Sequence, residues 1–136
     1  MKAIVVEHYG DPSVLRLVDA APPRPGPGEV IVRVRMTNVN FRDEQERRGR
    51  YAARTTLPQV PGLEGSGTIA APGAGVVGLA VGQRVAAFAA RGAHAESKAV
   101  SAALTYALSG DVGRGVEPEQ LSAACGVSCD ASRTGR

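Results

Sequence analysis

The stretch that decides the fold runs from residue 57 to residue 88 and reads LPQVPGLEGSGTIAAPGAGVVGLAVGQRVAAF. It contains two short apolar runs, Gly67–Ala71 and Arg84–Phe88, separated by a segment rich in glycine and proline. Short apolar runs bounded by Gly and Pro are typical of β-strands joined by turns. Glycine also permits positive φ angles and the close approach of a neighbouring backbone. We therefore predict two strands and a glycine-rich connection at the corner of a barrel or sandwich.

The connection contains a literal G-x-G-x-x-G, at Gly73–Gly78. A dinucleotide-binding fingerprint needs a strand that leads into the glycines, a helix that opens on them and an acidic residue about 20 positions later. Here Pro72 comes directly before the motif, and further glycines fall where the helix would run. The residue 20 positions after Gly78 is Lys98. We therefore interpret this motif as a β-turn connection and not as a nucleotide site.

Further strands are expected on both sides of this stretch. The clearest is Glu29–Met36, in which the valines and Met36 fall on one face and two arginines fall on the other. It follows Ala21–Gly28, a proline-rich segment that we expect to be an extended surface connector. The other predicted strands are Lys2–Glu7, Val14–Val18, Ala95–Val100 and Leu104–Leu108.

Two segments have helical character. Phe41–Arg50 consists of helix-forming residues and Gly49 would end it, but it is polar almost throughout. A helix with no apolar stripe is expected to be solvent-bridging or marginal. Glu117–Val127 begins with a proline at a favourable first helical position, and Ser128–Arg136 is expected to be a frayed tail. The sequence thus predicts one domain over residues 1–127, mainly β with short helices.

Composition narrows the class of protein. The chain has 136 residues, of which 43% are hydrophobic and 21% charged, as in a globular domain. Its net charge of +3 is modest and does not by itself imply nucleic acid. We find no signal peptide and no apolar run near the roughly 20 residues of a membrane span, so we expect a cytoplasmic protein. Cys125 and Cys129 are interpreted as reduced thiols, because two thiols alone do not make a zinc site.

In this order and spacing, the segments resemble the N-terminal, GroES-like half of the medium-chain dehydrogenase/reductase superfamily. The branch is similar to the zinc-independent quinone oxidoreductases, which are related to ζ-crystallin and to the enoyl reductase domains of polyketide synthases. The resemblance covers about residues 1–127 and implies a partly open, GroES-like β-barrel. It rests on MKAIVV…YGDPSVLRL, PGPGEVIVRV, NVNFRD…RRGRY, LPQVPGLEGSG and GVVGLAVGQRVAAF.

The resemblance also identifies what differs from the family. Zinc-dependent members carry a Cys after the long strand and a His-Glu pair in the PG segment. This chain has Val39–Phe41 and Gly62–Glu64 in those places, so no catalytic zinc is expected. Family members continue into a Rossmann domain that binds the cofactor, whereas Ser128–Arg136 does not fit that continuation. The resemblance therefore indicates a truncated or frame-shifted member that lacks the Rossmann domain.

The function implied by the resemblance is NADPH-dependent hydride transfer to a quinone or an enone, with the nicotinamide in a cleft between two domains. The protein then contributes positioning and electrostatics. Asn40 matches an asparagine that lines this cleft, and the alternative is a loop-capping role. Asp43 would orient Asn40 or an arginine near the cofactor, or would only favour the first turn of a helix. Tyr51 matches a tyrosine that borders the substrate pocket, and the alternative is a packed loop residue.

Other residues of the motifs are interpreted as structural. Glu64, between Gly62 and Gly65, is expected to be a buried carboxylate satisfied by backbone amides or by an arginine. His94 is expected to be a turn or strand residue and not a base. Glu44–Glu46 stands where relatives carry apolar or aromatic residues, which would alter the pocket and weaken helix docking.

A rival, non-enzymatic interpretation rests on an arginine cluster that could bind an anionic partner. Ion pairs with the interleaved acids explain the cluster without a partner. One pair would join Asp43 to Arg47, and another would join Glu44 to Arg48. We therefore expect no nucleic acid partner, but self-association through the barrel face that relatives cover with their second domain. The cluster consists of Arg42, Arg47, Arg48, Arg50 and Arg54.

Overall fold

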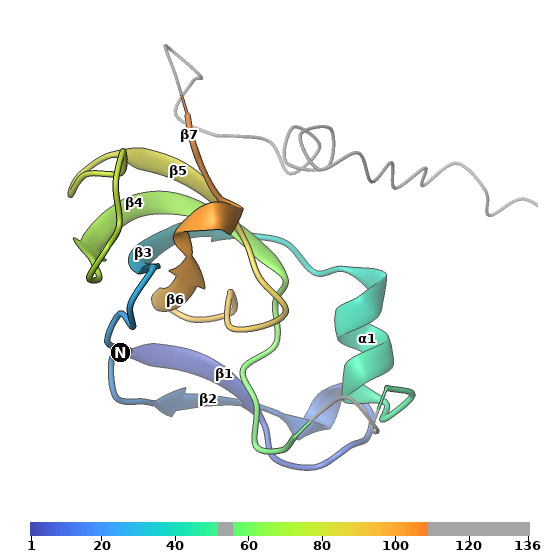
Figure 1. The fold of residues 1–136 in the computed structure, drawn as a ribbon. Coiled ribbons are helices and arrows are strands. Elements are labelled where there is room, and N and C mark those ends of the chain that lie inside the picture. The colour runs from blue at the N-terminus through green and yellow to red at the C-terminus, as the bar shows by residue number, and fades with distance from the viewer. Residues whose placement is uncertain (52–55, 109–136) are drawn as a thin grey trace, which may run out of the picture.

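The structure is a computed structural model and describes residues 1–51 and 56–108. Figure 1 shows a curled sheet above a smaller hairpin, with one helix beside them. The helix is α1 (Phe41–Arg47), and short 3-10 turns are formed by Pro12–Val14 and Ala102–Leu104. The strands are β1 (Lys2–Val6), β2 (Leu15–Asp19), β3 (Glu29–Thr37), β4 (Glu64–Pro72), β5 (Arg84–Phe88), β6 (Ser97–Ser101) and β7 (Thr105–Ala107).

The larger sheet is antiparallel and has the strand order β6-β3-β4-β5-β7. Its core is aliphatic, because the chain has no Trp and few other aromatic residues. The predicted mainly β, GroES-like barrel with short helices is confirmed. The buried core residues of this cluster are Val30, Val32, Ile69, Val85, Ala87 and Val100.

The long strand β3 is buried on both faces near its start. Val30, Ile31 and Val32 are all buried, and Arg33 is exposed. The register between β3 and β4 shifts between Ile31 and Val32, and again after Val34. The first shift leaves an extra residue, Ala70, on β4 and does not change the direction of Ile31. The register of β3 with β6 is unbroken here, so Ile31 points to the face opposite Val30 and Val32, as predicted, and it is buried there as well.

The contact between β3 and β4 requires a glycine. A Cβ atom on Gly67 would lie 1.9 Å from the carbonyl oxygen of Arg33. No real Cβ can approach a backbone oxygen so closely, so the two strands pair in this register only because residue 67 has no side chain. The connection from β4 to β5 is a loop, as predicted from its G-x-G-x-x-G. Three of its glycines have positive φ: Gly75, Gly78 and Gly82.

Helix α1 corrects the prediction of a marginal or solvent-bridging helix. Four of its polar side chains are buried, and that of Glu46 is almost completely so. Glu46 accepts a bond of 2.8 Å from Nε of Arg42, and the guanidinium of Arg47 donates to the carbonyl oxygen of Gly10. The helix is therefore held by hydrogen bonds and ion pairs in place of an apolar stripe. The polar run at Glu44–Glu46 does not prevent docking.

The hairpin of β1 and β2 forms a sheet of its own. Isolated bridges join Ala3 to Ala95 and Val6 to Gln59. Hydrogen bonds of 2.8 Å run from the Ile4 amide to the carbonyl of His94 and from the Val6 amide to the carbonyl of Gln59. The hairpin thus lies against the loops that flank β4 and β6 and not within the barrel sheet.

Some predictions fall outside the described residues. These are the helix predicted at Glu117–Val127, the segment directly before it, the tail at Ser128–Arg136, and the thiols of Cys125 and Cys129. The domain boundary at residue 127 therefore stays a prediction. In the described part of the chain, no helix has the length and apolar character needed to cross a membrane.

Candidate functional site

The segment from β3 to α1 carries the candidate residue Asn40, and one carboxylate holds it in place. Oε1 of Glu64 accepts a bond of 2.8 Å from Nδ2 of Asn38 and one of 3.2 Å from Nδ2 of Asn40. Nδ2 of Asn40 also donates to Oδ1 of Asn38, at 3.2 Å. Glu64 is buried, but the partners of its carboxylate are side-chain amides. The expected backbone amides or arginine do not fill this role.

The second carboxylate at the segment belongs to Asp43. Its Oδ2 accepts a bond of 2.8 Å from the backbone amide of Asn40, and its Oδ1 accepts one of 3.0 Å from the amide of Gly62. Asp43 therefore ties the start of α1 to the loop that leads into β4. This carboxylate does orient Asn40, by way of the backbone. It is buried by these contacts, and it is also an acid of the first turn of α1, as the alternative expects, where it completes the capping box with Asn40.

The glycines next to Glu64 allow this packing. Gly62 has a φ of +97°, and a Cβ there would lie 2.7 Å from the backbone nitrogen of His94. A Cβ on Gly65 would lie 3.0 Å from the carbonyl oxygen of Met36. Both positions therefore bring another backbone segment close to Glu64, in line with the structural role that we predict for them.

A buried lysine lies near these carboxylates. Lys98, on β6, is only 3% exposed, and its Nζ donates to the carbonyl oxygen of Leu63 at 3.4 Å. Burial lowers the pKa of Lys98 to about 8, and the negative charges of Glu64 and Asp43 oppose this shift. The sequence interpretation missed Lys98. The available signal was its place on the same face of the strand as Val100, which is the core side.

This lysine predicts a pH dependence of stability. Between pH 8 and pH 10.5, Lys98 holds its proton in the unfolded chain but loses it in the folded one, so stability rises with pH. The gain attributable to Lys98 approaches about 3 kcal/mol. We expect urea unfolding of the wild type to show this rise and Lys98→Met to lack it. The exposed Lys2→Met is the matched control, and parallel pH curves for the wild type and Lys98→Met would contradict the prediction.

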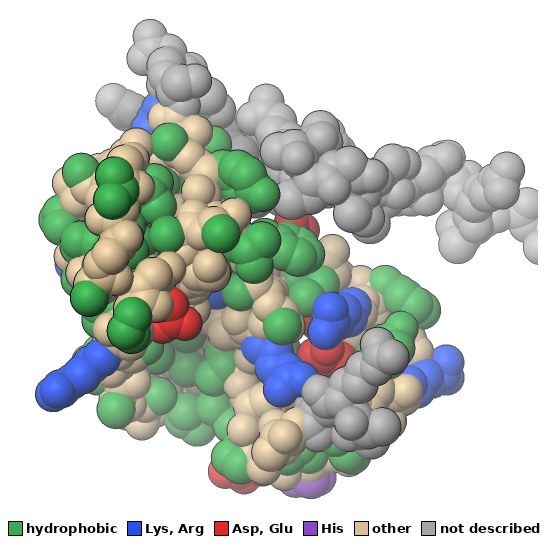
Figure 2. All heavy atoms as spheres, viewed as in Figure 1, with side chains coloured by type: hydrophobic (Ala, Val, Ile, Leu, Met, Phe, Trp, Pro, Cys, Tyr) green, Lys and Arg blue, Asp and Glu red, His purple; other side chains and the backbone are tan. Residues whose placement is uncertain are grey.

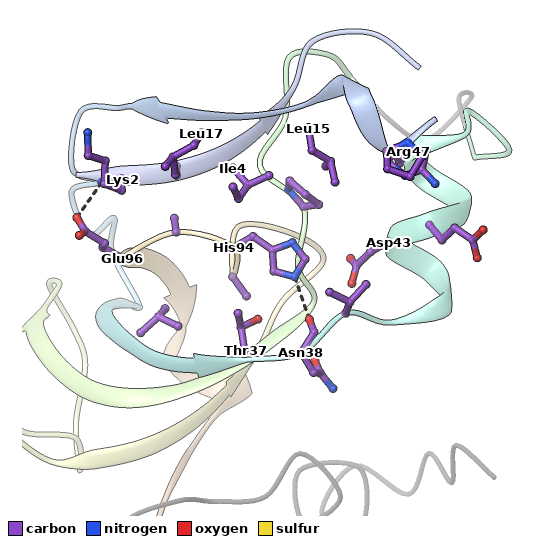
Figure 3. Close-up of a pocket in the computed structure, with 18 of the residues that line it drawn as sticks. Lys2, Ile4, Leu15, Leu17, Thr37, Asn38, Asp43, Arg47, His94 and Glu96 are labelled. Atoms are coloured by element: carbon purple, nitrogen blue, oxygen red, sulfur yellow. Dashed lines mark hydrogen bonds between the residues drawn. The ribbon is translucent and has the colours of Figure 1, made fainter. Parts of the chain in front are cut away.

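A cavity of about 750 Å³ lies between the hairpin and the segment from β3 to α1. Figure 3 shows Ile4, Leu15 and Leu17 of the hairpin on one side of it, and Asn38 and His94 on the other. The imidazole Nε2 of His94 lies 2.9 Å from the carbonyl oxygen of Asn38. His94 is thus placed in the wall of the cavity, in the loop before β6.

The structure does not bring all the predicted site residues together. Asn38 and Asp43 line the cavity, whereas Asn40 and Tyr51 are not among its lining residues. Tyr51 follows α1 and is 41% exposed. Asn40 lies next to the wall of the cavity, where its side chain binds Asn38 and Glu64. In the described part of the chain, it is grouped with Glu64 and not with Tyr51.

The arginine cluster is largely engaged within the protein. Arg48 pairs with Glu44 at 2.7 Å, as predicted, and Arg42 pairs with Glu46 at 2.8 Å. The predicted pair of Asp43 and Arg47 is replaced by other contacts, since Asp43 binds backbone amides and Arg47 binds Gly10. Figure 2 shows acidic and basic side chains next to each other around α1. Arg54 lies outside the described residues.

No metal centre is seen within residues 1–51 and 56–108, where no group of three or more His, Cys, Asp or Glu side chains is arranged to hold an ion. The fold is that of a GroES-like domain. It combines a curled antiparallel sheet, a separate hairpin, and a helix that follows the Asn38–Asn40 segment. The family model for the alcohol dehydrogenase GroES-like domain matches residues 26–132. The chain belongs to this family.

The chain is similar to oxidoreductases of the medium-chain dehydrogenase/reductase superfamily. It is 37% identical over 108 residues to the synaptic vesicle membrane protein VAT-1 homolog of Rattus norvegicus, covering 78% of this chain and 27% of that protein. It is 45% identical over 85 residues to a quinone oxidoreductase of Pseudomonas aeruginosa, covering 62% and 26%. The crystal structure of Escherichia coli quinone oxidoreductase complexed with NADPH matches with a TM-score of 0.79 and 28% identity, covering 83% and 35%. The chain thus spans about a quarter of the length of the curated relatives that it matches.

Proposed function

We propose that this chain supplies the substrate-side domain of an NADPH-dependent, zinc-independent quinone or enone oxidoreductase, located in the cytoplasm. The observation that carries the proposal is the Asn38–Asn40 segment, which Glu64 and Asp43 hold in place beside exposed apolar residues. Similarity to quinone oxidoreductases, one of them in complex with NADPH, supports the choice of reaction and cofactor. When bound, NADPH would supply the hydride for the conjugated carbonyl.

The amide of Asn40 has a defined role in this proposal. Its two N–H groups are directed to Glu64 and Asn38, and its side-chain oxygen faces the backbone N–H of Asp43 in the capping box of α1, so one lone pair of Oδ1 remains for a ligand. Asn40 would therefore accept a hydrogen bond from a donor, such as the carboxamide of a nicotinamide. It would not donate to the carbonyl of a quinone. Tyr51 follows α1, whereas Asn40 precedes it, and the phenol of Tyr51 would donate to that carbonyl.

The reaction can be tested with the chain alone and with a hybrid. The chain alone is expected to show no oxidation of NADPH by benzoquinone above buffer, because the pyrophosphate site of such enzymes lies in a Rossmann domain. A hybrid that carries residues 1–108 in place of the matching part of the Pseudomonas aeruginosa enzyme should be active. Asn40→Ala should lower its kcat/KM about tenfold, the value of one hydrogen bond.

Val77→Ala, on the exposed loop from β4 to β5, is the control and should leave the activity of the hybrid unchanged. A folded hybrid without turnover would overturn the proposed reaction. Turnover by the 136-residue chain alone would instead contradict the proposal that a separate Rossmann domain is needed to bind the cofactor.

The proposal also gives the exposed apolar residues a partner. Val39 and Phe41, on either side of Asn40, are 80% and 71% exposed. We propose that this face is covered by a second domain in the full enzyme and by a second copy in the isolated chain. Light scattering at high concentration should then show self-association, and Phe41→Ser should reduce it. Val77→Ser, at a position 90% exposed, is the matched control, and a monomeric wild type would contradict the prediction.

The arginine cluster does not favour a second function. Arg42, Arg47 and Arg48 already bind partners within the protein, which leaves few guanidinium groups for an anionic partner. We therefore do not propose a nucleic acid or anion-binding function.

A further inference from the structure

The ammonium group of Lys98 is not explained by hydrogen bonding. An ammonium has three donors, and its hydrogen bond to the carbonyl oxygen of Leu63, at 3.4 Å, is long for an N–H···O bond. Burying a charge is costly unless other charges compensate it. The compensation comes from Glu64 on β4 and Asp43 on α1, both buried. The residue that pairs with Lys98 on β3 is Val32, which is apolar and offers no compensating charge.

The two carboxylates that compensate Lys98 have a second feature in common. Each is bonded to Asn40: Glu64 to its side-chain amide, and Asp43 to its backbone amide. Glu64 also binds the amide of Asn38. The buried positive charge and the candidate asparagine are therefore linked through the same two acidic groups, although β6 and the start of α1 are more than 50 residues apart in the sequence.

We propose that Lys98 is a positioning residue for the Asn38–Asn40 segment. Its ammonium lies at the carbonyl oxygen of Leu63, the residue before Glu64, and offsets the buried negative charges of Glu64 and Asp43. These carboxylates fix the direction of the Asn40 amide. If Lys98 became neutral, both carboxylates would lose their nearby opposite charge, and their bonds to the segment would change. The role of Asn40 in binding a nicotinamide rests on the proposed function, but the link between Lys98 and Asn40 does not.

The link predicts a coupled titration at the segment. The pKa of Lys98, about 8, lies within the range in which the protein can be studied folded. Glu64 and Asp43 face Lys98 from β4 and α1. His94 reaches the segment from the loop before β6, at the carbonyl oxygen of Asn38. A variant at Lys98 is therefore needed to assign a change at the segment to Lys98 and not to His94.

The experiment follows the side-chain amide signals of Asn38 and Asn40 by two-dimensional NMR of the isotope-labelled 136-residue chain. Between about pH 6 and about pH 10, both signals should shift with a midpoint near pH 8. The shift near pH 8 should be absent from Lys98→Met. The amide of Gln83, in the loop before β5, lies in another part of the fold and serves as the internal control.

Lys98→Arg provides a second variant, because a guanidinium keeps its charge throughout this range. Its asparagine signals should not move near pH 8. The proposal is overturned if the wild-type signals show no step near pH 8, if Gln83 shows the same step, or if the step survives in either variant. Where neither variant folds, His94→Gln, which removes the imidazole at the carbonyl oxygen of Asn38, replaces them. A step near pH 8 that persists in His94→Gln supports the proposal, and its loss overturns it. Because no turnover is measured, this result is independent of the NADPH test of the hybrid.

Discussion

Replacing Gly67 with alanine is expected to destabilise the folded chain by about 3 kcal/mol or more. The added Cβ would meet the carbonyl oxygen of Arg33 at 1.9 Å and its carbonyl carbon at 2.9 Å. Both atoms belong to the backbone of β3, so no side-chain rotation can relieve the clash. The two strands would have to separate or shift register at the centre of the sheet. Urea unfolding followed by circular dichroism measures the loss.

Gly75→Ala is the matched control, since it makes the same chemical change in the loop that follows β4. Gly75 has a φ of +77°, but a Cβ there would meet nothing within 4 Å. Its expected cost is about 1–2 kcal/mol, the penalty of a left-handed conformation alone. If Gly67→Ala proved no more costly than Gly75→Ala, the close approach of β3 and β4 would not be a constraint on the fold.

The second large effect is expected at Glu64. Glu64→Leu should cost about 3–5 kcal/mol near pH 7, because it leaves Lys98 as a buried charge without its nearest compensation. It also removes the acceptor for the amides of Asn38 and Asn40. Glu64→Gln should cost less, since its carbonyl oxygen still accepts a hydrogen bond although the charge is gone.

Two comparisons isolate the role of the charge at position 64. Glu44→Gln breaks the exposed ion pair with Arg48 and should cost only about 0.5 kcal/mol. The double variant Glu64→Leu/Lys98→Met removes both buried charges, and it should recover much of the stability lost in Glu64→Leu. Strictly additive effects of the two single variants would show that Lys98 and Glu64 do not interact.

The positions of glycine and proline between the apolar runs made much of the fold predictable. β5 has the bounds that the apolar run Arg84–Phe88 predicts, and the glycine-rich loop before it lies where the sequence placed it. β4 is longer than predicted and begins at Glu64. Its first residues include two glycines, which locally favour a turn. These residues form a strand because β4 pairs with β3 on one side and with β5 on the other. Tertiary contacts thus outweigh the local propensity.

The site was less predictable because its contacts join distant parts of the chain. Glu64 meets Asn38 across 26 residues, and Arg47 meets Gly10 across 37. Local sequence patterns report neither contact. The predictions of a marginal helix and of backbone or arginine partners for Glu64 were therefore wrong. Motif resemblance did identify Asn40, Asp43 and Glu64 as candidates, and the structure shows that these three residues form one network.

The separate sheet of β1 and β2 bears on how the molecule opens. Regions with few main-chain bonds to the rest of a protein undergo local unfolding at lower free energy than its core. Four main-chain hydrogen bonds join β1 to the loops before β4 and β6, and two of them come from the amides of Ile4 and Val6. Amide hydrogen exchange at these two positions would thus proceed by detachment of the hairpin, while the barrel strands stay protected. Since the hairpin is one wall of the cavity, that motion would open the cavity to large molecules and leave the asparagine network intact.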